Sequence, residues 1–257
     1  MTSSKLVSII TVSFNSEKTI KDTVKSINSQ TYNNIEHILI DGNSNDKTLK
    51  VYHSIIQLRK FTVLSEPDEG IYDAMNKGVN ISNGEIIFIL NSDDVFYDNN
   101  IVENFVDIFQ NQPEVDIVYG SIQISSNENI KKVKRVWIPS RFKPNSFKKA
   151  WHPPHPGLVV KKECYEKYGN FNSSFKIAAD FDLMLRFFEL HKLKSFRTEF
   201  FVTIQRGGGA SMKFSGIIKG LNEIYYSFKN NNIKVFFLGF IFMRYKQKII
   251  QHLKNKF

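Results

Sequence analysis

The chain has 257 residues, of which 42% are hydrophobic and 23% are charged, and it contains one cysteine, Cys164. This composition excludes a largely disordered chain, and the single cysteine excludes an intrachain disulfide framework and a cysteine-based zinc cluster. The sequence holds neither a run of about 18 apolar residues nor a signal-peptide pattern, so we expect no membrane-spanning helix and a reducing compartment.

The net charge of +10 is unevenly distributed along the chain. Residues 1–126 hold 9 lysines and arginines against 17 aspartates and glutamates, whereas residues 127–257 hold 26 against 8. The acidic half suits a divalent cation, and the basic half suits phosphates, nucleic acid or an anionic membrane.

The first half alternates apolar runs with amphipathic stretches. Strands are predicted at 6–12, 35–40, 61–64, 85–90 and 115–119, and helices after residue 15 or 16 and at 46–58, 72–79 and 101–109. This alternation predicts βαβ units and therefore an α/β fold with a mostly parallel, doubly wound sheet.

The second half is less regular. Residues 125–150 are expected to form loops with a strand at 133–137, and the three prolines in 151–157 exclude a helix interior there. A short strand at 158–160 and a helix at 181–191 are predicted to follow.

Carboxylates follow three consecutive predicted strands. Asp41 ends the second strand, Asp68 follows the third, and Asp93 and Asp94 follow the fourth. Because ligands bind at the carboxyl ends of parallel strands, we expect these groups at one edge of the sheet. Asp46 is instead more typical of a turn former or helix cap.

Adjacent charges at Asp93 and Asp94 would repel each other unless a cation or hydrogen-bond donors compensate them. Mg²⁺ or Mn²⁺ would do so and would bridge to a phosphate ligand. The sequence contains neither of the usual glycine-rich phosphate loops, so we expect a diphosphate to be held through the metal.

Three segments carry a family resemblance: SIITVSFNSEKTIKDTVKSINSQTY, HILIDGNSNDKT and SEPDEGIYDAMNKGVNISNGEIIFILNSDD. They resemble inverting glycosyltransferases of family 2, and the similarity covers about residues 5–212. It implies a GT-A fold, with a Rossmann-like, mostly parallel central sheet flanked by helices. A catalytic domain at 1–215 would comprise a nucleotide-sugar-binding half (about 1–125) and an acceptor-binding half (126–215). A basic, Phe-rich C-terminal helical segment (216–257) would follow.

The resemblance also implies a donor site. Its members would be Thr11, Ser13, Asn15 and Asp41 around the base, Asp68 at the nucleoside, Lys77 near phosphate, and Asp93 and Asp94 at ribose and metal. Asp94 matches the metal position of a D-x-D motif whose first acid is replaced by Asn91, and Asp93 is left to ribose or metal.

The general base is expected in the second half, where Asp180 matches the family's catalytic aspartate and Ala179 replaces the glutamate before it. Asp182 stays open as an alternative base, and either residue could merely cap the helix. His155, preferred over His152, is a candidate for the acceptor or metal site.

The segment from Arg206 to Ser211 contains the only glycine triplet. It resembles a loop that closes over both substrates and limits hydrolysis of the donor, and Arg206 is a candidate partner for the diphosphate. The same segment could also be a plain linker.

Residues 234–257 hold six lysines and arginines and no acidic residue. They are expected to form either a terminal helix packed on the core or an interfacial helix on anionic lipid. A lipid-linked acceptor, which the resemblance makes plausible, favours the membrane surface. We therefore expect a cytoplasmic protein, peripheral on the inner face of the cell membrane.

These observations predict a metal-dependent inverting glycosyltransferase of bacterial surface-polysaccharide assembly. Its donor would be a nucleotide-diphosphate sugar, UDP-linked by preference, and its acceptor a hydroxyl of a glycan or lipid-linked saccharide. The transferred group would be a hexosyl or N-acetylhexosaminyl unit, and no nucleic-acid partner is expected. Two alternatives stay open: a nucleotidyltransferase, and a non-enzymatic basic module that binds membrane or nucleic acid.

Overall fold

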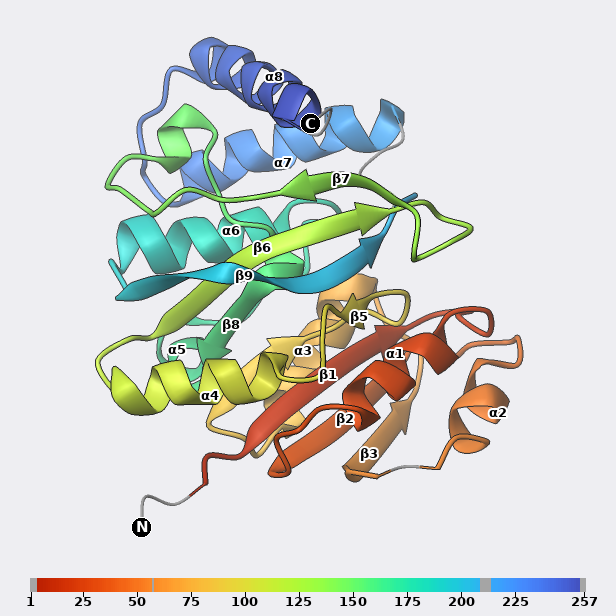
Figure 1. Ribbon diagram of the computed structural model, residues 1–257. Coiled ribbons are helices and arrows are strands. Elements are labelled where there is room, and N and C mark those ends of the chain that lie inside the picture. The colour runs from red at the N-terminus through yellow and green to blue at the C-terminus, as the bar shows by residue number, and fades with distance from the viewer. Residues whose placement is uncertain (1–3, 57, 209–213, 255–257) are drawn as a thin grey trace.

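The structure is a computed structural model that describes residues 4–56, 58–208 and 214–254 (Figure 1). Its strands are β1 (Val7–Ser13), β2 (Ile35–Asp41), β3 (Lys60–Ser65), β4 (Ile86–Ile89), β5 (Val95–Phe96), β6 (Ile117–Ser125), β7 (Val133–Trp137), β8 (Leu158–Lys161) and β9 (Ser195–Arg206). Its helices are α1 (Ile20–Asn28), α2 (Thr48–His53), α3 (Ile71–Ile81), α4 (Ile101–Asn111), α5 (Lys162–Tyr168), α6 (Ala179–Leu185), α7 (Phe214–Asn230) and α8 (Phe237–Lys254). Three short helical turns complete the list: η1 (Phe147–Lys149), η2 (His155–Gly157) and η3 (Arg186–Leu190).

The described strands form one sheet of nine, in the order β3-β2-β1-β4-β8-β6-β9-β5, with β7 paired to β6. Strands β3, β2, β1 and β4 are parallel neighbours, so their carboxyl ends share one edge, as the sequence predicts. The second half is mixed rather than parallel. Strand β8 lies antiparallel to both β4 and β6, because no crossover helix separates β6 from β8 along the chain.

Helices cover both faces of the sheet, which explains why the parallel strands are continuous apolar runs. Ile10 and Val12 of β1 belong to a core shared with α3, α5, α6 and η3, whereas Val7 and Ile9 belong to a core shared with α4. The expected α/β fold with a central sheet between helices is confirmed.

The helix predicted at 181–191 begins earlier, at Ala179, and changes form along its length. It is an α-helix to Leu185 and then a π-helical turn, η3. The wider turn lets the consecutive Phe187 and Phe188 both reach the core, where each is fully buried.

The C-terminal helices α7 and α8 pack on the sheet domain and lie at the top of Figure 1. Ile224 and Phe228 of α7 and Phe240 of α8 are buried in the same core as α3 and α6. The segment from residue 216 onwards therefore shares its core with the preceding chain. None of the described helices combines the length and apolarity needed to cross a membrane.

A carboxylate of α7 fixes the segment that leads into α6. Glu223 is 7% exposed, and its oxygens accept hydrogen bonds from the backbone N–H groups of Lys176, Ile177 and Ala178 at 2.8–2.9 Å. Three backbone donors that would otherwise be unpaired in a partly buried loop thereby find one acceptor group. The loop ahead of Asp180 consequently depends on a side chain from the C-terminal region.

We expect Glu223→Gln to lower the free energy of unfolding by about 1–3 kcal/mol, because an amide loses the charge and turns an N–H₂ toward N–H donors. Urea unfolding followed by circular dichroism measures this change. The matched control is Glu166→Gln, whose carboxylate is largely exposed and pairs only with Lys162 at 3.5 Å. The control should change stability by less than about 0.5 kcal/mol, and equal losses in both variants would contradict the role given to Glu223.

Candidate active site

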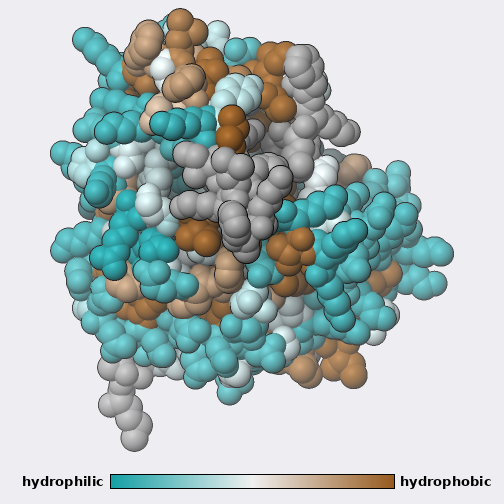
Figure 2. All heavy atoms as spheres, turned by 45° about the horizontal axis from the view of Figure 1, so that its top comes forward, coloured by the Kyte–Doolittle hydropathy of each residue, from teal (hydrophilic) through white to brown (hydrophobic). Residues whose placement is uncertain are grey.

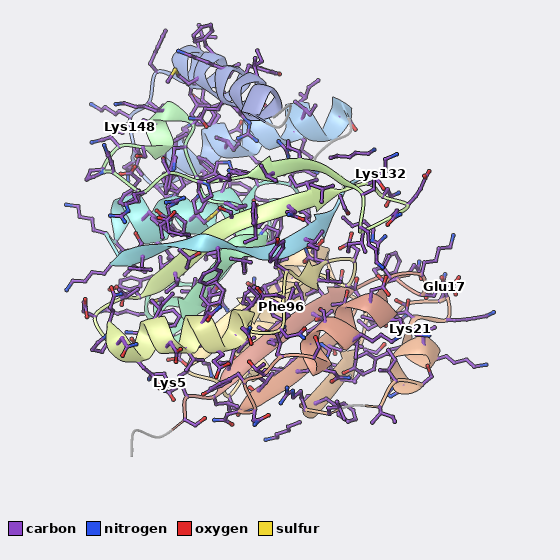
Figure 3. All side chains as sticks on the ribbon, in the orientation of Figure 1. Lys5, Glu17, Lys21, Phe96, Lys132 and Lys148 are labelled. Atoms are coloured by element: carbon purple, nitrogen blue, oxygen red, sulfur yellow. The ribbon has the colours of Figure 1, made fainter. Side chains whose placement is uncertain are left out.

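A cleft of about 1080 Å³ opens at the carboxyl ends of β1 and β4. Figure 3 labels Lys5 and Glu17 beyond opposite ends of β1, and Glu17 lies at the end where the cleft is. The walls come from the loops after β1, β3 and β4, from β6, β7 and the end of β9, and from the segments around His155, Asp180, α7 and α8. The cleft therefore occupies the edge at which parallel sheets bind ligands.

Ser13 and Asn15 line the cleft from the loop after β1. Asn15 adopts a left-handed backbone conformation (φ 50°), which asparagine tolerates better than most residues. Its N–H donates to Ser44 Oγ at 2.8 Å, and its Oδ1 accepts from the N–H of Asn45 at 3.0 Å. These bonds tie the loops after β1 and β2 together.

Asp41 is fully buried and holds these loops from beneath. Its two oxygens accept hydrogen bonds from Ser13 Oγ, from the N–H and Oγ of Ser44, and from Ser65 Oγ, at 2.6–3.0 Å. Four donors, from the ends of β1 and β3 and from the loop after β2, leave its carboxylate engaged within the protein. The geometry therefore favours a positioning role over direct contact with a base.

Thr11 and Lys77 are also placed outside the cleft walls. Thr11 is fully buried, and its hydroxyl lies 3.0 Å from Nε2 of His37, a core histidine whose pKa burial lowers to about 3. The Lys77 ammonium is 2.8 Å from Glu66 and 2.8 Å from the carbonyl oxygen of Pro67, with Asp73 at 3.5 Å. The donor-binding roles expected for both residues stay predictions that this geometry does not favour.

Asp68 lines the cleft from the loop after β3. Its Oδ1 accepts a hydrogen bond from the N–H of Gly70 at 2.8 Å, and its Oδ2 lies against Gly42, where any side chain would collide with it. Glycine at 42 is therefore what allows this carboxylate to lie over the loop after β2. Asp46 accepts hydrogen bonds from the N–H and hydroxyl of Thr48 at the start of α2, an arrangement that fits the turn-forming alternative expected for it.

Asp93 and Asp94 lie at the end of β4, where Asp93 lines the cleft and Asp94 is 1% exposed beneath it. Burial raises the pKa of both carboxyl groups, and the charge of Asp93 raises the pKa of Asp94 further. Asp94 Oδ1 accepts from the backbone N–H of Arg206 at 3.0 Å, and Oδ2 accepts from Nδ2 of Asn91 at 3.4 Å.

These donors suit a hard divalent cation. Asn91 Oδ1 is buried and has no hydrogen-bond partner among the described residues. This amide oxygen is therefore available as a ligand in addition to the two carboxylates. Oxygen-only ligands are those that Mg²⁺ and Mn²⁺ prefer. Within the described chain no group of three or more His, Cys, Asp or Glu side chains could hold a metal, so phosphate oxygens would have to complete the coordination.

Arg206 joins the end of β9 to this carboxylate pair. Besides its backbone bond to Asp94, its guanidinium donates to the carbonyl oxygens of Asp93 and Asn127 at 3.3 and 3.2 Å and pairs with Asp22 at 3.4 Å. Its side chain is 8% exposed, so the diphosphate contact expected for it stays a prediction. The remainder of the expected closing loop, residues 209–211, lies outside the described residues.

Asp180 and His155 line the cleft. The Tyr72 hydroxyl donates to Oδ1 of Asp180 at 3.2 Å and to the carbonyl oxygen of Ile177 at 2.8 Å. Burial lowers the pKa of His155 although the nearby Asp180 charge opposes this shift, so its imidazole is neutral at neutral pH. His152 also lines the cleft, with its ring edge-on to Trp137.

Asp182, the alternative base, points into the interface between α6 and α7. Its carboxylate pairs with Arg186 at 3.0 Å and accepts hydrogen bonds from Ser227 Oγ at 2.7 Å and Asn231 Nδ2 at 3.1 Å. This side chain is 4% exposed. Of the two candidates, the structure therefore brings Asp180 to the cleft and buries Asp182 in a structural network.

Several residues that shape the cleft are not among those expected from the sequence. Tyr72 lay in a segment that the family resemblance singled out, yet only its neighbour Lys77 was chosen. Arg135 and Arg244 line the cleft from β7 and α8, elements that the sequence analysis regarded as a loop-bound strand and a tail. No local motif marks these two arginines or Glu223.

The family model described as Glycosyl transferase family 2 matches residues 8–168, more than half of the chain. The chain belongs to this family. An uncharacterized glycosyltransferase of Mycobacterium tuberculosis, Rv1514c, is 34% identical over 188 residues, which are 72% of this chain and 70% of that protein. A PGL/p-HBAD biosynthesis glycosyltransferase of Mycobacterium bovis is 25% identical over 71% of this chain and 70% of its own length.

Solved structures show the same fold at low identity. The glycosyltransferase chain matches residues 1–349 of S. aureus TarS with a TM-score of 0.65 at 15% identity, covering 94% of this chain and 72% of that one. In a longer TarS structure it spans 40% of the chain. The mannosyltransferase PcManGT from Pyrobaculum calidifontis, in complex with GDP-Man and Mn²⁺, matches with a TM-score of 0.64 at 14% identity and covers 94% and 74% of the two chains. The expected family and fold are thus confirmed, and neither a nucleotidyltransferase nor a non-enzymatic module is favoured.

The buried carboxyl pair predicts a dependence of stability on pH. The pKa of Asp94 is higher in the folded than in the unfolded chain, so the folded protein loses stability as pH rises from about 4 through the folded pKa. Asp94→Asn removes this penalty, and we expect the metal-free variant to melt at least about 2 °C above the wild type at pH 7, with a smaller difference at pH 4. Differential scanning fluorimetry measures both values.

The same variant tests the metal site. Mn²⁺ with UDP should raise the melting temperature of the wild type, more at pH 8 than at pH 5.5, because protons compete with the cation. Asp94→Asn should abolish that rise, whereas Asp107→Asn, at an exposed position of α4, should retain it. A full Mn²⁺ response in Asp94→Asn would exclude this carboxylate as a ligand.

Proposed function

We propose that this glycosyltransferase moves a hexosyl or N-acetylhexosaminyl unit from a nucleotide-diphosphate sugar, preferably UDP-linked, to a hydroxyl of a glycan or lipid-linked saccharide. The transfer would invert the anomeric carbon and serve bacterial surface-polysaccharide biosynthesis. One observation carries the proposal: a single cleft holds Asp93, above the buried Asp94, at the strand ends and Asp180 along its wall. The TarS complexes with UDP and UDP-GlcNAc and the PcManGT complex with GDP-Man support a nucleotide-linked donor.

At the donor end, Ser13, Asn15 and Asp68 would bind the nucleoside through hydroxyl, amide and carboxylate groups that the surrounding loops hold in place. Asp93 and Asp94, with Asn91 Oδ1, would hold Mn²⁺ or Mg²⁺. When bound, the cation supplies positive charge that offsets the charge of the departing diphosphate. Arg206 adds a fixed guanidinium next to the same carboxylates.

At the acceptor end, Asp180 would act as the general base. The acceptor oxygen forms a bond to the anomeric carbon, the bond from that carbon to the diphosphate oxygen breaks, and the hydroxyl proton goes to Asp180. Tyr72 donates to Oδ1 of Asp180, which orients the carboxylate and leaves Oδ2 for the acceptor. A single displacement of this kind inverts the configuration of the carbon that is attacked.

We expect Asp180→Asn to reduce kcat by about 10²–10⁴-fold, as loss of a general base does, while melting temperature and nucleotide binding stay near wild-type values. Asp182→Asn is the informative comparison, because Asp182 belongs to a buried network. It should lower the melting temperature and leave kcat within a few-fold at a permissive temperature. The reverse pattern would make Asp182 the base.

The stereochemistry of the product tests the displacement independently. Proton NMR of the first product formed should show an anomeric configuration opposite to that of the donor. A screen of nucleotide sugars with Mn²⁺, read out as release of nucleoside diphosphate, identifies the donor for this experiment. Retention of configuration would overturn the mechanism, and release of pyrophosphate would overturn glycosyl transfer itself.

We also place the enzyme on the anionic inner face of the cell membrane. Helix α8 is the uppermost helix of Figure 1, and Figure 2 shows hydrophobic residues gathered at the upper end of the molecule among hydrophilic ones. Leu238, Phe242, Tyr245 and Ile249 recur at helical spacing along α8 and are 49–73% exposed. Apolar side chains on a basic helix suit the headgroup region of an anionic leaflet.

Replacing Leu238 and Phe242 together by serine should reduce co-sedimentation with phosphatidylglycerol-rich vesicles by about tenfold or more, because two large side chains lose their apolar burial. Leu190→Ser is a matched control at a position 45% exposed on η3, and it should bind as the wild type does. Wild-type protein that stays in the supernatant with these vesicles would exclude the membrane location.

A further inference from the structure

Helix α8 has two different faces. Phe237, Phe240, Ile241 and Arg244 recur at helical spacing on the inner face: Phe240 is 1% exposed, and Phe237 and Ile241 pack against the main core. Arg244 follows them on this face and lines the active-site cleft. The helix that presents apolar residues to the outside therefore also delivers a cation to the reaction site.

Arg244 has an unusual environment for a partly buried cation. Among the described residues it makes no hydrogen bond, and no carboxylate lies within 4.0 Å of its guanidinium. Burial lowers its pKa, which means that the surroundings disfavour its charge, and the nearby charge of Asp180 opposes this effect only in part. An anion at this position would relieve the cost of that burial.

The geometry assigns this anion to the end of the cleft away from the donor, because another arginine, Arg206, already lies at the donor end. Arg206 is bonded to Asp93 and Asp94, whereas the carboxylate that influences Arg244 is Asp180, the proposed base at the acceptor. Helix α8 also packs against β7, which brings Arg135 into the same wall of the cleft. Two arginines thus accompany Asp180 on the acceptor side.

We propose that Arg244 binds a phosphate group of a lipid-linked acceptor, in a subsite beside Asp180. This inference rests on the proposed function and specifies its acceptor. Arginine matches phosphate with a planar fork of donors. The exposed apolar residues of the same helix would meet the lipid chain, so one helix would recognise both parts of the acceptor.

The test uses farnesyl phosphate as the probe, with farnesol and inorganic phosphate as comparisons, and titrates each into the full chain below the micellar concentration. We expect farnesyl phosphate to bind the wild type, and Arg244→Gln to weaken that binding by about tenfold or more, as loss of a charge-assisted hydrogen bond implies. Arg244→Lys should give an intermediate affinity, because it keeps the charge without the fork. Lys246→Gln, at an exposed position of α8, should bind as the wild type does.

Three results would overturn the proposal: undiminished binding of farnesyl phosphate to Arg244→Gln, equal binding of farnesol, or an equally strong Arg244-dependent effect of inorganic phosphate, which would assign the subsite to free phosphate.

UDP and GDP with Mn²⁺ supply a separate readout. Arg244→Gln should keep the wild-type thermal shift with nucleotide, and this shift also shows that the variant is folded. Loss of the shift would place Arg244 at the donor end and would overturn the proposal. A wild type that binds farnesyl phosphate but neither nucleotide would contradict the proposed function instead.

Discussion

Two neighbouring carboxylates at the end of a buried strand are the constraint on which the cleft depends. Asp94 has almost no contact with water and lies next to Asp93. Ionisation of either carboxyl group therefore makes ionisation of the other less favourable. Among the described residues, Asp94 accepts one backbone N–H from Arg206 and a long contact from Asn91, and the Arg206 charge offsets the repulsion only in part. A bound cation, as proposed above, would make this arrangement favourable, and its position would then determine where a diphosphate and a reacting sugar could lie.

The fold supplies the rigid frame for this pair. Parallel pairing of β3, β2, β1 and β4 aligns their carboxyl ends, and Asp41, Ser44 and Asn15 bind the intervening loops to one another. Many polar groups of these loops therefore hydrogen-bond to one another within the protein. The groups left to face the cleft, such as Asp68 and Asp93, are carried by loops in which several backbone N–H groups are paired.

Sequence patterns predicted the first half of the fold well, because parallel strands covered on both faces are continuous apolar runs. Asp68, Asp93, Asp180 and His155, which the patterns and the family resemblance marked, all line the cleft, and the roles expected for them stay predictions. The patterns could not separate Asp68 from Asp41, since both are aspartates at strand ends and only the positions of Ser13, Ser44 and Ser65 decide which carboxylate is engaged internally. For Lys77, the acidic neighbours are visible in the sequence, but the short distances that hold its ammonium against Glu66 and Asp73 are not.

The residues that were missed come from distant parts of the chain. Glu223 and Arg244 act on the surroundings of Asp180 through tertiary contacts that no local spacing reveals. The matched family region ends at residue 168, so the family model does not describe the part of the cleft wall that carries Asp180 and Arg244.

The hydrogen bonds from Lys176, Ile177 and Ala178 to Glu223 have a consequence for biosynthesis and for evolution. During translation, the loop that carries Asp180 gains this anchor only once α7 emerges from the ribosome, because Glu223 lies on that helix. A chimaera that took α7 from a relative would accordingly need an acceptor group at position 223 to keep the loop in place.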